Sequence, residues 1–441
     1  MNDIHARLLD LGLAIPQLLL PRRGADLSAW AVIACDQFTQ DRGYWERVRQ
    51  AAGGRASTLN LIYPEVFLEG DDRAGRIAAI HRAMARYLEG DVFAPPFSGC
   101  VYVERDTPYR RRRRGLVVAV DLDCYDWGGR ARTLIRATEG TLPERLPARM
   151  DIRRNAPLEC PHILLLVDDR EDILLGSLAG LPDSAEPAYR GDLMLGSGSV
   201  SGWRLDREGH WARIAEGLEA LRRRAPGGFL YAVGDGNHSL AAAKGVWEEI
   251  KAACGGEIAG DPRRFALVEI ENLHDPAISF EPIHRIVFDA DPDALIAALA
   301  PLPGLKAYPV EGAERLCRLV GDPGAPQARL GLVAGSRCLV LETAATGIVT
   351  AALQPLLDRF AGGAIDYIHG EEELLRLAGA RPPAVGQRPE ERRAVGILLP
   401  PVRKENLFET VARSGPLPRK SFSMGESVEK RFYLECRQLL Y

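Results

Sequence analysis

The stretch F-L-Y-A-V-G-D-G-N-H-S-L-A-A-A-K, from Phe229 to Lys244, decides how the fold of this chain is interpreted. Its first residues, up to Val233, form a short apolar run of β-favouring side chains, which predicts a buried strand. The alanines that follow Ser239 predict a helix, because alanine has the highest helix propensity. The glycines on either side of Asp235 interrupt both patterns. We therefore expect a strand, a tight turn and a helix in succession.

The turn between this strand and this helix has the chemistry of an anion site. We expect Asp235 to be the helix N-cap, its carboxylate accepting from the backbone N–H of Asn237 or His238. Unpaired amides and the helix dipole both favour an anion at such a first turn. Gly236 allows close approach to the backbone, and His238 adds a side-chain donor. A turn that only joins strand to helix is the alternative, since Asp-Gly is a common turn dipeptide.

Composition and charge limit the classes of function. The chain has 441 residues, of which 46% are hydrophobic and 26% charged, as in ordinary globular proteins of two or three domains. Its formal net charge of −4 gives no indication of a nucleic-acid partner. It contains no apolar run of membrane-spanning length and no signal-peptide pattern, so we expect a cytoplasmic protein without a membrane partner. The 8 cysteines contain no C-x-x-C pair, which favours reduced, mostly buried thiols.

The pattern of apolar residues predicts an α+β or mixed α/β protein with several domains. Residues 1–289 are expected to form the main domain or domains. After Phe288 the sequence changes to shorter segments that alternate between helix and strand patterns, including an expected hairpin from Ala328 to Glu342. We therefore predict an α+β unit or insertion over residues 290–385. The remaining segment, 386–441, is predicted to pack back on the main domain.

Polar side chains recur near the ends of the expected strands. Ligands of open α/β sheets bind at such strand ends, so these side chains are candidates for the same site as the turn. The run from Trp30 to Cys35 is expected to be a strand, and the carboxylate after it has capping of the next helix as its alternative role. The candidates with this placement are Asp36, Glu139, His284 and Arg285, and Arg136 is a further basic candidate for binding phosphate.

Four motifs carry a resemblance to a known family: W-A-V-I-A-C-D-Q-F, I-R-A-T-E-G-T, D-G-N-H-S-L-A-A-A and E-P-I-H-R. In this order, and over nearly the whole chain, the sequence resembles the bacterial and archaeal domain-of-unknown-function family numbered 1015. The usual central motif of that family is D-G-H-H-R. This chain keeps Asp235, Gly236 and His238 but has Asn237 and Ser239 where the family has histidine and arginine. The missing arginine removes one phosphate clamp.

The D-G-x-H motif is in turn similar to one in the ParB/sulfiredoxin-like group, which includes free-serine kinases. This resemblance implies a ParB/sulfiredoxin-like element and phosphate binding by Gly236, Asn237, His238 and Ser239. It also implies phosphoryl transfer to a small hydroxyl substrate. Genes of the family often lie beside serine-biosynthesis genes, an association that suggests serine metabolism without showing an activity.

The leading hypothesis is a small-molecule phosphotransferase, a kinase acting on serine or a related hydroxy-amino acid. Such a reaction requires charge stabilisation of the phosphoryl group, usually a divalent ion, and a carboxylate near the attacking hydroxyl. We expect Mg²⁺, with unknown ligands, and a nucleotide, ATP or ADP. Asp36, Glu139 and His238 are the catalytic candidates. The phosphorylated ligand is expected at Asp235, Gly236, Asn237, His238 and Ser239, with further contacts from Arg136, His284 and Arg285.

Two alternatives remain open from the sequence. A non-catalytic regulator that binds a nucleotide or phosphorylated metabolite is favoured by Asn237 and Ser239, which replace the family's histidine and arginine. A metal-dependent phosphatase would use the same carboxylates with water as nucleophile. For that class, Asp121-Leu122-Asp123 has a suitable spacing but is expected to end a hairpin strand.

Overall fold

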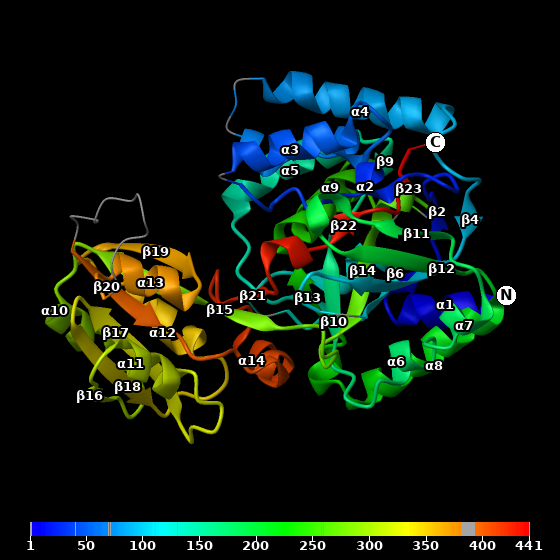
Figure 1. The fold of residues 1–441 in the computed structure, drawn as a ribbon. Helices are drawn as coiled ribbons and strands as arrows, with labels where there is room; N and C mark the ends of the chain where they lie inside the picture. The colour runs from blue at the N-terminus through cyan, green and yellow to red at the C-terminus, as the bar shows by residue number, and fades with distance from the viewer. Residues whose placement is uncertain are drawn as a thin grey trace. The chain divides into compact units, whose positions relative to one another are not determined.

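The computed structural model describes residues 2–39, 41–68, 70, 72–110, 112–129, 131–256, 258, 260–380 and 393–440. The chain divides into two compact units, one made of Met1–Ile278 with Glu426–Tyr441 and the other of Ser279–Gly425 (Figure 1). Helices and strands of both units are mixed along the chain, so the predicted α+β, multidomain class is confirmed. The domain boundary predicted between residues 385 and 386 lies outside the described residues.

A 10-stranded mixed sheet forms the centre of the first unit. Most neighbouring strands are antiparallel, whereas β10 with β14, β13 with β8, and β7 with β8 are parallel. The order across the sheet is β11 (Tyr189–Asp192), β12 (Ser199–Leu205), β5 (Cys100–Asp106), β6 (Arg113–Asp121), β14 (Phe265–Asn272), β10 (Leu164–Val167), β13 (Tyr231–Asp235), β8 (Ile135–Ala137) and β7 (Tyr125–Asp126), with β1 (Leu13–Ala14) paired to β6.

Apolar side chains of this sheet alternate between two cores. Along β6, Leu116 and Val118 belong to one buried cluster and Val117 to the other, because successive side chains of a strand point to opposite faces. Helices α1 (Asn2–Asp10) and α8 (Glu208–Arg224) contribute to the first cluster, and α3 (Arg42–Ala52) and α4 (Arg73–Glu89) to the second. Figure 1 shows these two pairs of helices on opposite sides of the sheet.

The predicted strand–turn–helix is confirmed: β13 is followed by α9 (Asn237–Cys254). The strand expected from Trp30 to Cys35 is mostly wrong. Its start belongs to α2 (Leu27–Trp30), because the Asp26 side chain accepts from Ser28 N and caps a short helix there. Only β3 (Val32–Ile33) is extended, paired antiparallel with β22 (Phe432–Tyr433).

The second unit has its own antiparallel sheet and its own apolar cores. The expected hairpin between Ala328 and Glu342 is present as β17 and β18. The order is β16 (Lys306–Pro309), β18 (Arg337–Thr343), β17 (Ala328–Ala334), β20 (Ala394–Leu398), β15 (Phe280–Phe288) and β19 (Ala364–His369), with β21 (Phe422–Met424) paired to β15. The helices are α10 (Pro292–Leu299), α11 (Ala313–Val320), α12 (Thr350–Leu357), α13 (Glu371–Leu377) and α14 (Leu407–Ser414).

Within the part of the chain that the structure describes, no helix combines the length and the apolar character needed to cross a bilayer.

Candidate functional site

The topology of the first unit brings several distant segments to one edge of its sheet. Because β13 and β8 are parallel, their carboxyl ends, at Asp235 and Ala137, lie at the same edge. The antiparallel strand β10 pairs Leu164 with Asp235, so the residues before β10, including His162, lie at that edge as well. The short β3–β22 pair brings the residue after Ile33 beside Arg431, whose carbonyl accepts from Ala34 N at 2.9 Å.

The turn between β13 and α9 differs from the prediction at its cap. The N-cap residue is Gly236, with φ +79°, and it provides no side-chain capping bond. Asp235 is still part of the strand, and its Oδ1 accepts from Gly236 N at 3.0 Å. The prediction that Asp235 caps the helix is therefore wrong, because the left-handed glycine moves the start of the helix one residue along the chain. As a result, the first turn of α9 has no side-chain cap, and its amides lack acceptors within the helix.

His162 lies at the centre of a group of buried and half-buried polar side chains near this turn and contacts three of them. Its Nε2 lies 3.3 Å from Ser239 Oγ and 3.7 Å from Asp36 Oδ2. Its Nδ1 lies 2.7 Å from the hydroxyl oxygen of Tyr433. If Tyr433 donates to Nδ1, the neutral ring carries its proton on Nε2, and the charged ring carries one there in any case. In both states, Nε2–H faces Asp36 and Ser239.

The charges around His162 favour its protonated form and the ionised form of Asp36. Burial raises the pKa of Asp36, but the charge and hydrogen bond of His162, the hydrogen bond from Gln37 and the charge of Lys430 together hold the pKa below its ordinary value. For His162 burial lowers the pKa, while Asp36, and then Asp235 and Glu65, raise it, and the net shift is upward. An ion pair of opposite charges therefore forms beside the first turn of α9.

Lys430 adds a second cation to this edge of the sheet. Its ammonium group is 3.6 Å from Asp235 Oδ2, and the residue is only 6% exposed. Among the described residues, Asp235 Oδ2 has no hydrogen-bond donor. The backbone around Lys430 is held by Arg105, which donates to the carbonyl oxygens of Val428, Glu429 and Lys430 itself. Here we call Asp36, His162, Asp235, Ser239, Lys430 and Tyr433 the His162 cluster.

Two side chains of the turn hold the loop that follows β8. Thr138 N donates to Asn237 Oδ1, and Leu142 N donates to His238 Nε2, both at 3.3 Å. Glu139 lies between these two anchoring points, in the same loop. In this arrangement His238 Nε2 is an acceptor, so the ring presents no proton from that atom to a ligand.

Arg136 lies on β8, and its guanidinium group is occupied by structural partners rather than directed at the turn. Its guanidinium group donates to the carbonyl oxygens of Thr133, at 3.0 Å, and Gly227, at 2.9 Å. The same group lies 4.8 Å from the ring centroid of Phe229. These contacts explain a buried arginine by local structure alone.

His284 and Arg285 belong to the second unit, on β15. Leu399 N donates to His284 Nδ1 at 3.1 Å, and burial, followed by the charge of Arg285, lowers the pKa of His284 to about 4. Arg285 donates to Gln354 Oε1 at 2.9 Å and to the carbonyl oxygen of Lys420 at 2.8 Å. Both side chains have structural partners within their own unit.

Three members of the His162 cluster were absent from the sequence prediction: His162, Lys430 and Tyr433. His162 precedes an apolar strand, and its polar role depends on Asp36, which is distant in sequence. Lys430 and Tyr433 lie in E-K-R-F-Y-L-E-C, where charges alternate with large apolar residues. That mixture is a signal for a buried polar segment, because charged side chains are buried only when paired.

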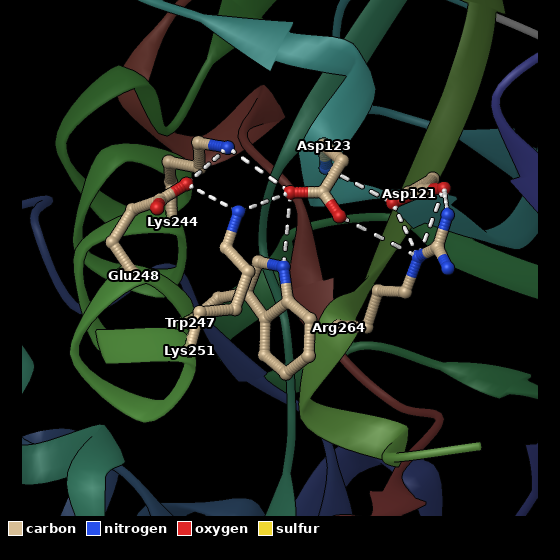
Figure 2. Close-up of polar contacts among 7 residues, drawn as sticks. All are labelled: Asp121, Asp123, Lys244, Trp247, Glu248, Lys251 and Arg264. Carbon is tan, nitrogen blue, oxygen red and sulfur yellow. Dashed lines mark hydrogen bonds and ion pairs between the residues drawn. The ribbon is translucent and has the colours of Figure 1, made fainter. Parts of the chain in front are cut away.

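From Lys244 onward, α9 carries a separate ion network (Figure 2). Asp123 Oδ1 accepts from Lys251 at 2.7 Å, Trp247 Nε1 at 3.0 Å and Lys244 at 3.4 Å. Figure 2 also shows Arg264 bound to Asp121, with Nη2–Oδ2 at 2.6 Å. Lys244 is thus occupied away from the turn, as are both carboxylates of the D-x-D sequence. Among the residues that the structure describes, no group of three or more potential metal ligands is found.

Sequence comparison supports the resemblance inferred from the motifs. The family described as "Protein of unknown function (DUF1015)" matches residues 19–359. The chain belongs to this family. None of the curated proteins searched matches it.

Solved structures give more distant likenesses. A conserved hypothetical protein from Pyrococcus furiosus is 13% identical, with a TM-score of 0.36, and the match covers 74% of this chain and 95% of that one. A free serine kinase in complex with AMP is 14% identical, with a TM-score of 0.38 and coverage of 76% and 95%. SbnI from Staphylococcus aureus, with a C-terminal truncation, is 10% identical, with a TM-score of 0.37 and coverage of 72% and 85%. At such scores these likenesses carry no functional argument.

Proposed function

We propose that the protein is a small-molecule phosphotransferase that holds a phosphate group at the first turn of α9 and transfers a phosphoryl group to a small hydroxyl compound. Serine or a related hydroxy-amino acid is the proposed acceptor, from the resemblance to free-serine kinases at the D-G-x-H motif. The observation that carries the proposal is the junction of an uncapped helix N-terminus with the buried His162 cluster.

The helix terminus supplies the anion site. An α-helix N-terminus presents free N–H groups and the positive end of the dipole, which together favour a phosphate. Ser239 Oγ accepts from His162, so its own hydroxyl proton is available to a phosphate oxygen. Position 236 requires glycine, because φ is +79° and a Cβ there would lie 3.1 Å from Ile163 Cα. The backbone at the start of the helix therefore carries no side chain at this residue. Lys430 adds positive charge beside the turn.

Asp36 is the proposed general base. Its carboxylate is held by His162 and by Gln37 Nε2, 3.1 Å from Oδ1, and its lowered pKa keeps it ionised and able to accept a hydroxyl proton. His162 orients this carboxylate. Glu139 lies in the loop that Asn237 and His238 bind to the turn. It is the second proposed carboxylate near the hydroxyl group of the acceptor substrate.

The residues present are compatible with a nucleotide and Mg²⁺ as cofactors. Mg²⁺ usually takes one or two protein carboxylates and completes its coordination with water and substrate phosphates. The Oδ2 of Asp235, which accepts no hydrogen bond from the described residues, is the oxygen suited to this purpose. Bound Mg²⁺ would neutralise charge that develops on the phosphoryl group. Arg136, His284 and Arg285 are not part of this proposal, because their polar groups have other partners.

A non-catalytic regulator is the second candidate. Its supporting observation is that Asn237 and His238 bond to the backbone of the loop 138–142. An anion that draws these side chains toward itself would release that loop. In this case a nucleotide or phosphorylated metabolite binds without turnover.

The test is ligand binding by calorimetry and thermal shift, with ATP, ADP, pyrophosphate, serine and phosphoserine, each with and without Mg²⁺. Ligands that bind the native state raise Tm as their concentration exceeds Kd. His238→Ala and Asp235→Asn are compared with wild type. Asp123→Asn is the matched control, since Asp123 binds Trp247 and Lys251 of the same helix, away from its first turn.

Three outcomes are distinguished. Binding of a nucleotide and a serine-type ligand, lost in His238→Ala but kept in Asp123→Asn, supports phosphotransfer and is followed by detection of product by ³¹P NMR. Nucleotide binding without turnover supports the regulator. If none of the ligands binds to the folded protein, the anion site at α9 is wrong.

A further inference from the structure

Two cysteines face each other across a short antiparallel pair in the first unit. Strand β9 (Leu158–Glu159) pairs with β23 (Arg437–Gln438), with Glu159 opposite Arg437. The same register, continued by one residue, sets Cys160 opposite Cys436. Figure 1 shows β9 and β23 side by side.

The backbone hydrogen bonds show whether Cys160 and Cys436 form a hydrogen-bonded or a non-hydrogen-bonded antiparallel pair. Cys436 N donates to Leu19 O at 2.9 Å, and Leu19 N donates to Cys436 O at 2.8 Å, so the backbone of Cys436 is directed toward Leu19. On the other side, Leu439 N donates to Pro157 O at 2.8 Å. Hydrogen-bonded pairs alternate along an antiparallel ladder, which makes Cys160–Cys436 a non-hydrogen-bonded pair.

Such a pair has the separation that a disulfide needs. Directly opposite residues of this kind have Cα atoms about 4.5 Å apart and side chains on the same face. Disulfides occur at Cα separations of roughly 4.4–6.8 Å. Both cysteines are free thiols in the structure. Burial, and then the neighbouring Cys436 thiol, raise the pKa of Cys160.

We propose that Cys160 and Cys436 are a reversible thiol–disulfide pair that links the C-terminal segment to the strand preceding His162 when the protein meets a small-molecule disulfide. The C-terminal segment also carries Lys430 and Tyr433. A disulfide at Cys436 therefore anchors the segment that completes the His162 cluster. The proposal does not depend on the proposed function.

The chemistry is two successive exchanges. Cys160 is partly exposed and Cys436 is 0% exposed, so Cys160 reacts first. Its thiol loses a proton, and the thiolate attacks oxidised glutathione, forming a mixed disulfide and releasing one glutathione thiolate. Cys436 then loses its proton and attacks the Cys160 sulfur, releasing the second glutathione. Two protein thiols are oxidised and one oxidised glutathione is reduced to two thiols. The raised pKa of Cys160 makes the first step faster at higher pH.

The experiment uses the full chain, reduced, freed of reductant and incubated with oxidised glutathione at pH 7 and pH 8.5. Alkylation and peptide mapping follow, with circular dichroism and Tm on the same samples. We expect a disulfide-linked peptide pair containing Cys160 and Cys436, faster formation of this pair at pH 8.5, a higher Tm and full reversal by dithiothreitol. Cys254→Ser, which removes an exposed thiol, is the matched control and keeps the linked pair.

Two variants keep the test decisive. Cys436→Ser is expected to stop at the Cys160–glutathione mixed disulfide, and Cys160→Ser to gain no bond at Cys436. If one variant does not fold, the other still tests whether the two cysteines form the disulfide. The proposal is overturned if folded wild-type protein yields no linked peptide containing Cys160 and Cys436, or if the linked peptides contain other cysteines.

Discussion

The two ends of helix α9 differ in how completely the polar groups around them are hydrogen-bonded. At the far half, Asp123 accepts from two lysines and from the buried Trp247, and Glu248 pairs with the same lysines. At the first turn there is no side-chain cap, and the Oδ2 of Asp235 has no hydrogen-bond donor among the described residues.

This contrast separates stability from function along one helix. Buried polar groups with complete partners stabilise a fold, whereas incompletely paired groups cost free energy and are kept where a ligand completes them. We therefore expect changes at Asp123 to affect unfolding without affecting ligands. Changes at the His162 cluster should affect ligands, and at the ion pair of His162 with Asp36 they should also affect unfolding in a pH-dependent way. The following predictions test this separation, from the largest expected effect to the smallest.

Asp36→Asn should lower kcat for phosphoryl transfer by roughly 10²–10⁴-fold, because a general base contributes about that factor and the amide cannot accept the hydroxyl proton. Turnover is measured by ³¹P NMR or a coupled assay, with circular dichroism to verify folding. The control is Asp126→Asn, which changes an exposed carboxylate in the same unit. A variant that keeps wild-type kcat would remove Asp36 from the proposed mechanism.

Asp123→Ala should lower the free energy of unfolding by about 1–3 kcal/mol, since it leaves the buried Trp247 N–H without its acceptor. Urea denaturation measures the change, and calorimetry with pyrophosphate should give an unchanged Kd. Glu248→Ala is the matched control: Glu248 is half-exposed, and both lysines keep Asp123, so the loss should be smaller. Loss of pyrophosphate binding in Asp123→Ala would contradict the separation of the two ends.

Lys430→Met should weaken pyrophosphate binding by roughly tenfold, the effect of losing one charge-assisted contact. Lys251→Met removes the same charge at the other end of α9 and should leave Kd unchanged. Calorimetry at low and high salt measures both. Equal weakening in the two variants would show a general effect of charge rather than a contact at the turn.

The stabilising effect of His162 should depend on pH. Its pKa is raised in the folded state, so its contribution is complete below the unfolded value of about 6.5 and is lost as pH rises through the folded value. The Tm difference between wild type and His162→Gln should therefore decrease as pH rises above about 6.5. In an Asp36→Asn background, which removes the largest cause that raises this pKa, the dependence should become weaker. A difference that grows with pH would refute the assignment.

The sequence allowed much of the local structure around α9 to be predicted. The apolar run before Gly234, the alanines after Ser239 and the glycines between them predicted β13, the turn and the helix, because each pattern depends on near neighbours. The cap was mispredicted by one residue. Asp235 has the preferred residue type, but Gly236 alone adopts φ +79° without strain, and this backbone conformation determines where the helix begins.

The amino-acid sequence by itself determined the family, the mixed α/β class and the polar turn at the end of an apolar strand. Only the tertiary structure decided which side chains join that turn. Strand pairing over long sequence distances brings His162, Lys430 and Tyr433 to Asp36 and Ser239, while Arg136, His284 and Arg285 bond elsewhere. Periodicity reports which face of an element is buried, but the partner of a buried charge is set by strand order and register, and these depend on the whole core.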